Sequence, residues 1–125
     1  MVMDKLQMRF FEFASEVFQV AAPLSDNKEL SGLAKEAIMA SSRMGSPFYR
    51  KNFWDFSEEE FDNNFMSARM DMHDTLLYLH MLVDRCPDNQ ELRNLEMKAR
   101  GFYVFLGGVV APPGEILVEP ERFNV

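Results

Sequence analysis

The chain has 125 residues, which fits one domain that can bury its own core. Its formal net charge of −7 disfavours nucleic acids and anionic membranes, because both are bound mainly through Lys and Arg. Cys86 is the only cysteine, so no internal disulfide can form; with no signal-peptide pattern and no long apolar run, we expect a cytoplasmic protein.

The first predicted element is an amphipathic helix over about residues 4–22. Its apolar residues recur at spacings of three and four, as on one face of a helix: Leu6, Phe10, Phe13, Val17 and Val20. Pro23 ends this helix or lies just beyond its end.

A second helix is predicted over about residues 27–44, with Asp26 as its N-cap and Glu29 at the third helical position. Its apolar face carries Leu30, Leu33, Ala37, Ser41 and Met44, and its many small residues favour close helix packing. Gly45 and Pro47 predict its end. The connection over residues 46–56 contains five aromatic residues, which we expect to fold over one end of the molecule or to dock on a partner.

Two further helices follow, over about residues 58–85 and about residues 88–106. A capping box over residues 57–60 starts the first of them, and Asp88 with Glu91 predicts the start of the second. The longer helix repeats its apolar positions without interruption: Phe61, Phe65, Ala68, Met72, Thr75, Leu79 and Leu82. The last helix does so at Leu92, Leu95, Ala99, Phe102, Leu106 and Val109, with Gly107 and Gly108 as its stop.

These four helices predict an all-α fold, an antiparallel up-down four-helix bundle over residues 1–110. Residues 111–125, which begin with two prolines and a glycine, predict an extended C-terminal tail.

Some apolar residues lie outside these core positions and indicate a second stripe. They are Phe11 and Phe18 in the first helix and Met66, Met70, His73, Leu77 and Met81 in the third. One interpretation is a wide face turned toward the core. The other is a subunit or partner interface, in which methionines and aromatic residues are enriched. Both interpretations stay open at this point.

No motif for catalysis or for a cofactor stands out. His73 and His80 lie about 10 Å apart along the helix, too far to bind one metal ion together, and neither has a Glu three residues earlier. Arg69 precedes His73 by four residues, a slightly narrower spacing than that of helical ribonuclease toxins, and a packing role is the simpler hypothesis. We therefore predict no catalytic residue, no metal and no cofactor.

The best candidate for a nucleic-acid patch is a set of basic residues among aromatic ones. It consists of Arg43, Arg50 and Lys51, close to Phe48, Tyr49, Phe53 and Trp54. Aromatic side chains among bases can stack on nucleotides, but the same side chains could close one end of the bundle, and we favour that structural interpretation.

The order of these segments resembles the four-helix-bundle family of the 23S ribosomal RNA intervening-sequence protein. The similarity spans about residues 10–110 and is carried by residues 11–14, 33–37, 42–45, 57–61, 68–69 and 101–106. It implies an up-down bundle that assembles as a homopentamer without an established enzymatic activity. The chain also looks distantly similar to the accessory protein of diversity-generating retroelements, a basic pentamer that binds nucleic acid and a reverse transcriptase.

From this sequence we expect a non-enzymatic, oligomeric helical bundle that acts through protein–protein contacts. The alternative is a nucleic-acid-binding accessory protein of a retroelement reverse transcriptase, which the acidic charge disfavours.

Overall fold

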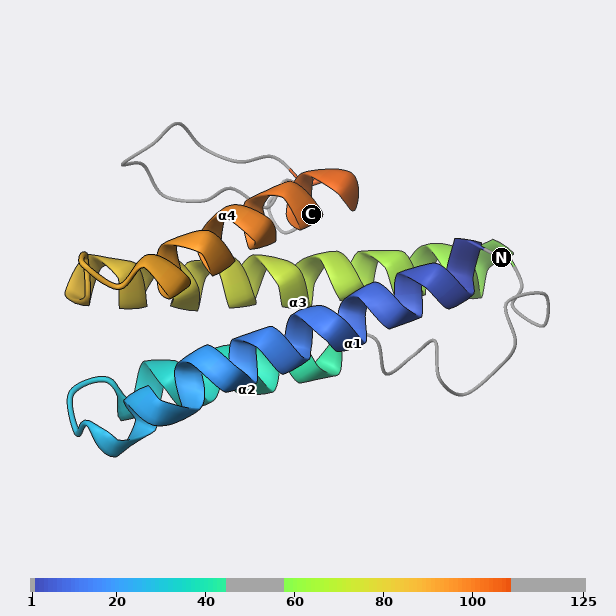
Figure 1. Ribbon diagram of the computed structural model, residues 1–125. Coiled ribbons are helices and arrows are strands. Elements are labelled where there is room, and N and C mark those ends of the chain that lie inside the picture. The colour runs from blue at the N-terminus through green and yellow to red at the C-terminus, as the bar shows by residue number, and fades with distance from the viewer. Residues whose placement is uncertain (1, 45–57, 109–125) are drawn as a thin grey trace, which may run out of the picture.

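A computed structural model describes residues 2–44 and 58–108 of the chain. Within these residues the chain forms four α-helices and one short 3-10 helix, and no strands (Figure 1). Their bounds are α1 Val2–Ala21, η1 Ala22–Asp26, α2 Ser31–Arg43, α3 Glu58–Arg85 and α4 Gln90–Phe105.

Successive helices run in opposite directions, so the predicted up-down topology is confirmed (Figure 1). Each helix packs against two others in a closed order: α1 on α2, α2 on α3, α3 on α4, and α4 on α1. The α1–α2 seam and the α3–α4 seam therefore lie on opposite sides of the bundle. This placement decides how the exposed residues are distributed.

The core is built from the residues that the helical spacing places on one face. Almost every predicted core position that the structure describes is buried or packs against the buried cluster. Tyr103 is a core residue that the spacing did not predict, and it lies fully buried one position after the predicted Phe102. Phe102 instead covers the α1–α4 side, with its ring stacked at 5.0 Å on that of Phe10. Among the described aromatic side chains, Phe10, Phe13, Phe102 and Tyr103 thus close the bundle, whereas others stay exposed.

The start of α2 differs from the prediction. Pro23 is followed by further turns of 3-10 helix to Asp26, because proline fits the first turn of a helix. The Asn27 side chain then accepts a hydrogen bond from the backbone N–H of Glu29 at 2.9 Å, and α2 begins only after Leu30. Asp26 as an N-cap is therefore wrong: Leu30 holds that position without a side-chain hydrogen bond.

The N-cap of α4 is also one residue later than predicted. Asn89, not Asp88, accepts a hydrogen bond from the backbone N–H of Leu92, at 3.1 Å. The predicted stop at the other end is confirmed. Gly107 has φ of +93° and donates to the carbonyl of Val104, while Gly108 donates to that of Tyr103. This pair of bonds ends a helix through a left-handed glycine.

Several predictions lie outside the described residues. These are the aromatic connection over residues 46–56 with Arg50 and Lys51, the helix stop at Gly45, the capping box at Ser57, and the tail over residues 111–125. The side chain of Phe61 is also outside the described part.

Candidate interaction surfaces

A groove runs along the outside of the α1–α2 seam. Phe11 and Phe18 each follow a buried residue of α1, Phe10 and Val17, so each is turned outward by about 100°. They stay 65% and 57% exposed. The space is about 510 Å³, and we call it the aromatic groove; its lining is Phe10, Phe11, Ala14, Ser15, Phe18, Gln19, Ile38, Ser41 and Ser42.

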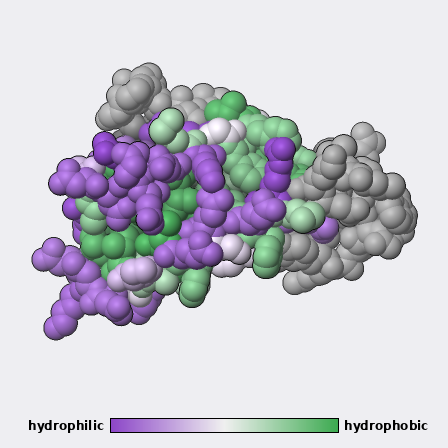
Figure 2. Space-filling model, viewed as in Figure 1, coloured by the Kyte–Doolittle hydropathy of each residue, from purple (hydrophilic) through white to green (hydrophobic). Residues whose placement is uncertain are grey.

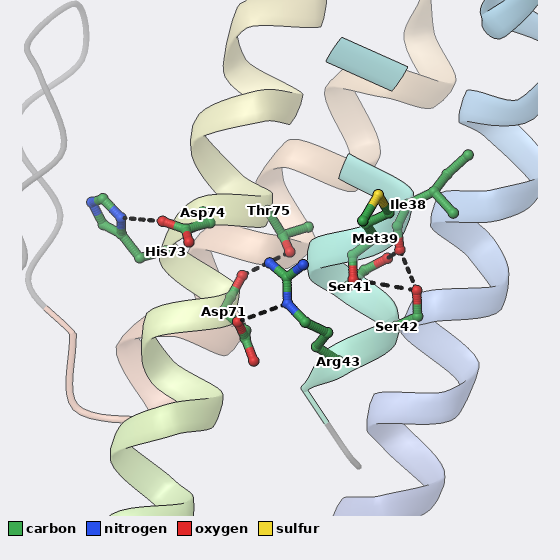
Figure 3. Close-up of polar contacts among 9 residues, drawn as sticks. All are labelled: Ile38, Met39, Ser41, Ser42, Arg43, Asp71, His73, Asp74 and Thr75. Carbon is green, nitrogen blue, oxygen red and sulfur yellow. Dashed lines mark hydrogen bonds and ion pairs between the residues drawn. The ribbon is translucent and has the colours of Figure 1, made fainter. Parts of the chain in front are cut away.

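The polar side chains that α2 contributes to the aromatic groove are bonded within their own helix. Ser41 donates its hydroxyl hydrogen to the carbonyl oxygen of Ile38 at 3.0 Å, and Ser42 donates to the same oxygen (Figure 3). Their donor capacity is thus used locally. None of the nine lining residues carries a charge. The groove is therefore suited to an apolar, uncharged occupant.

The basic residue of α2 next to this groove is turned toward α3. Arg43 donates from Nε to the carboxylate of Asp71 at 3.4 Å, and the hydroxyl of Thr75 donates to the backbone carbonyl of Asp71 at 2.8 Å (Figure 3). Arg43 was one of three residues in the predicted nucleic-acid patch. Its charge is partly balanced by Asp71, which weakens it as a phosphate ligand.

The α3–α4 seam is bridged by charged side chains. Nδ1 of His80 lies 2.6 Å from Oε1 of Glu96, and Arg100 donates to the same oxygen at 3.1 Å. Asp84 lies 3.8 Å from the other ring nitrogen of His80. The Glu96 side chain is only 12% exposed, so its bonds are well shielded from water. The contact between His80 and Glu96 joins α3 to α4 and helps fix their register, while the contacts of Arg100 and Asp84 each lie within one helix.

Apolar residues flank this bridge on the solvent side. Met70, Met81, Met97 and Val104 each come one position after a residue of the seam, namely Arg69, His80, Glu96 and Tyr103. They are therefore all turned outward by about 100°. Met97 is 70% exposed and Val104 56%. We call this surface the methionine face, consisting of Met66, Met70, Leu77 and Met81 of α3 with Met97 and Val104 of α4.

The structure thus divides the predicted second stripe between two surfaces. Phe11 and Phe18 belong to the aromatic groove, and the stripe residues of α3 other than His73 belong to the methionine face on the opposite side of the bundle. Figure 3 also shows His73 on the other side of α3 from Arg43. Leu77 is half-buried and packs against the core, as the core-facing interpretation predicts, while the interface interpretation stays a prediction for the exposed residues.

Arg69 and His73 are covered by the end of α4. Their exposed fractions are 9% and 7%. The His73 ring centre lies 5.7 Å from that of Tyr103, and a Cβ added to Gly107 would lie 3.1 Å from a guanidinium nitrogen of Arg69. A cation at this place interacts favourably with the helix C-terminus. His73, predicted as a possible interface residue, is therefore a packing residue in the described chain.

A third surface follows the α1–α4 seam. Phe13, Phe102 and Phe105 line a cleft of about 410 Å³, and Lys98 closes its rim with an ion pair to Glu16 at 2.7 Å. Figure 2 shows apolar areas between hydrophilic ones on the face where α1 lies in front. Unlike the aromatic groove, this cleft has four charged residues in its lining, Arg9, Glu12, Glu16 and Lys98.

Sequence reasoning missed Ile38, Ser42, Met97 and Val104 as parts of the two surfaces. Exposed residues do not recur at a regular spacing that the sequence reveals. Which of them share a surface depends on which helices pack side by side. The described residues bring together no group of His, Cys, Asp or Glu that could hold a metal ion.

The fold defines the chain as an all-α protein with four helices in an up-down bundle. The sequence matches no family model, no curated protein and no solved structure in the comparisons with known proteins. None of the helices in residues 2–44 and 58–108 is long and apolar enough to cross a bilayer.

Proposed function

We propose that this chain is a non-enzymatic helical-bundle protein that associates with itself and acts through protein–protein contacts. The observation that carries this proposal is the aromatic groove. Two phenylalanines that the core does not need stand more than half exposed, seven residues apart, beside an uncharged floor. Exposed apolar surface rimmed by polar residues is typical of protein interaction sites.

The character of the lining favours protein over nucleic acid. Nucleic-acid sites depend on cations that neutralise phosphates. The aromatic groove has no cation, and Arg43 nearby is paired with Asp71. The coverage of Arg69 and His73 supports the non-enzymatic part of the proposal, because neither side chain can meet an RNA backbone without rearrangement of α4. The family resemblance adds an expected size, a pentamer.

Light scattering coupled to gel filtration tests the proposal over a dilution series. We expect a mass several times 14.5 kDa that falls on dilution. Phe18→Lys should lower the mass to that of one chain, because it places a charge in an apolar contact. A wild-type mass of one chain at every concentration would contradict the proposal.

A further inference from the structure

We infer that the aromatic groove is occupied by the methionine face of a second copy, so that the chains associate head to tail. This inference rests on the proposed self-association and specifies its contact. A symmetric contact would pair groove with groove, whereas here two different surfaces of the same molecule meet.

The two surfaces match in spacing. The aromatic groove is a concave space with Phe11 and Phe18 seven residues apart, which is about 10.5 Å along a helix. On the methionine face, Met97 and Val104 are also seven residues apart and are among the most exposed apolar side chains of the chain. One row can therefore follow the other along the groove.

The side chains of the two surfaces also suit each other chemically. Methionine is unbranched and flexible, and its sulfur makes favourable contacts with aromatic rings. The aromatic groove offers the rings, and the methionine face offers Met70, Met81 and Met97. The small residues on the groove floor, Ala14 and Ser15, leave room for a long side chain to enter between the two phenylalanines.

The exposed apolar area also matters. Among the described residues, four large apolar side chains are exposed on α1 and α2, namely Phe11 and Phe18 of the groove with Met8 and Met39 outside its lining, and four in the methionine face, namely Met66, Met81, Met97 and Val104; Phe105 of α4 is also exposed but lines the cleft beside α1. At roughly 100 Å² for each half-exposed side chain, the two sides supply about 800 Å² of apolar area. A standard interface of about 1,600 Å² has about 900 to 1,000 Å² of it. The two sides together come close to what a stable contact needs.

The geometry also explains why a second copy is the fitting occupant. A foreign partner in the aromatic groove would leave the methionine face uncovered. A contact between copies covers both surfaces at once, and because they lie on opposite sides of the bundle it can continue from chain to chain. Such head-to-tail contacts close into a ring or extend as a filament.

The test uses two variants of the full chain, one for each surface. Phe18→Lys disables the groove and keeps the methionine face, and Met97→Lys disables the methionine face and keeps the groove. Both positions are exposed on helices, where Lys is well tolerated, and circular dichroism checks the fold. Asn94→Lys is the matched control, since it adds the same charge to α4 in a different cleft.

Sedimentation velocity should find each variant monomeric alone, with association weakened at least about tenfold. Mixed at equal concentration, they should form a heterodimer, because the mixture contains one intact groove and one intact methionine face. Since a single contact lacks the help of ring closure, the mixture is measured up to about tenfold above the wild-type assembly concentration. Asn94→Lys should assemble like the wild type.

Two results would overturn the inference while leaving the proposed function standing. One is assembly of Met97→Lys at the wild-type concentration, which would show that the methionine face is not used. The other is a mixture that stays monomeric although the wild type assembles. A wild type that is monomeric throughout would overturn the inference and the proposed function together.

Discussion

The two seams on opposite sides of the bundle are held by different kinds of contact. The α1–α2 seam is lined by aromatic and small residues, and its serines bond within α2. The α3–α4 seam is crossed by the hydrogen bond between His80 and Glu96, and Arg100 donates to Glu96 from within α4. Directional bonds between helices fix their register, whereas a seam whose polar groups are satisfied locally depends on packing. The seam that depends on packing also leaves an uncharged groove along its outside.

The largest effect should come from the packed seam. Phe10 lines the groove of this seam, is 1% exposed and also stacks on Phe102 of α4, so Phe10→Ala should lower the free energy of unfolding by about 3–5 kcal/mol. Chemical denaturation measures the change. Phe11→Ala, its exposed neighbour, is the control and, at dilutions where the chain is monomeric, should stay within about 0.5 kcal/mol. Equal losses at both positions would contradict the burial of the Phe10 face of α1.

The next effect tests the bridged seam. Glu96→Gln keeps the shape of the side chain but removes the charge that His80 and Arg100 share, and we expect a loss of about 1–3 kcal/mol in the free energy of unfolding. Asp84→Asn should cost much less, because Asp84 is largely exposed and lies 3.8 Å from His80. If both changes cost the same, the carboxylate of Glu96 is not the centre of the bridge.

Alanine at the two glycines in and just after α4 should change the free energy of unfolding in opposite directions. Gly107→Ala requires a side chain at φ of +93° and should destabilise by about 1 kcal/mol. At Gly101 an added Cβ meets nothing within 4 Å, and Gly101→Ala should stabilise the helix by roughly 0.5–1 kcal/mol. Thermal unfolding of the two variants shows the difference directly. The same sign for both would contradict the helix end at Gly107.

The smallest effect sharpens the account of the aromatic groove. Ser42→Ala removes a hydroxyl that bonds only within α2 among its described contacts, so stability should change by less than about 0.5 kcal/mol. Self-association, followed by gel filtration, should also stay unchanged. A marked loss of association would mean that Ser42 bonds to the partner, and that the groove binds the second copy by more than apolar contacts.

Much of the architecture follows from periodicity. The bounds of α3 agree with the prediction of residues 58–85, because its apolar spacing runs without interruption through the whole helix. Helix starts were harder to predict. Asp26 and Asp88 have the chemistry of N-caps, but Pro23 continues the chain as a 3-10 helix and Asn89 competes directly with Asp88. Neighbouring residues with equally good capping chemistry cannot be told apart from the sequence alone, because tertiary packing decides which of them caps the helix.

The interaction surfaces were only partly predictable. The sequence indicates that Phe11 and Phe18 lie outside the core positions, but not that they face away from α3. His80 and Glu96 are sixteen residues apart, and their contact depends on the register of two antiparallel helices, which no single helix encodes. The exposure of Met97 follows from the same register.

The methionine face also makes the surface sensitive to oxidants. Oxidation converts a methionine thioether into a polar sulfoxide, and exposed side chains such as Met97 and Met81 are the accessible ones. A preparation exposed to peroxide would therefore carry a more polar surface on α3 and α4 than one kept free of oxidants, while the buried Met72 stays protected inside the bundle.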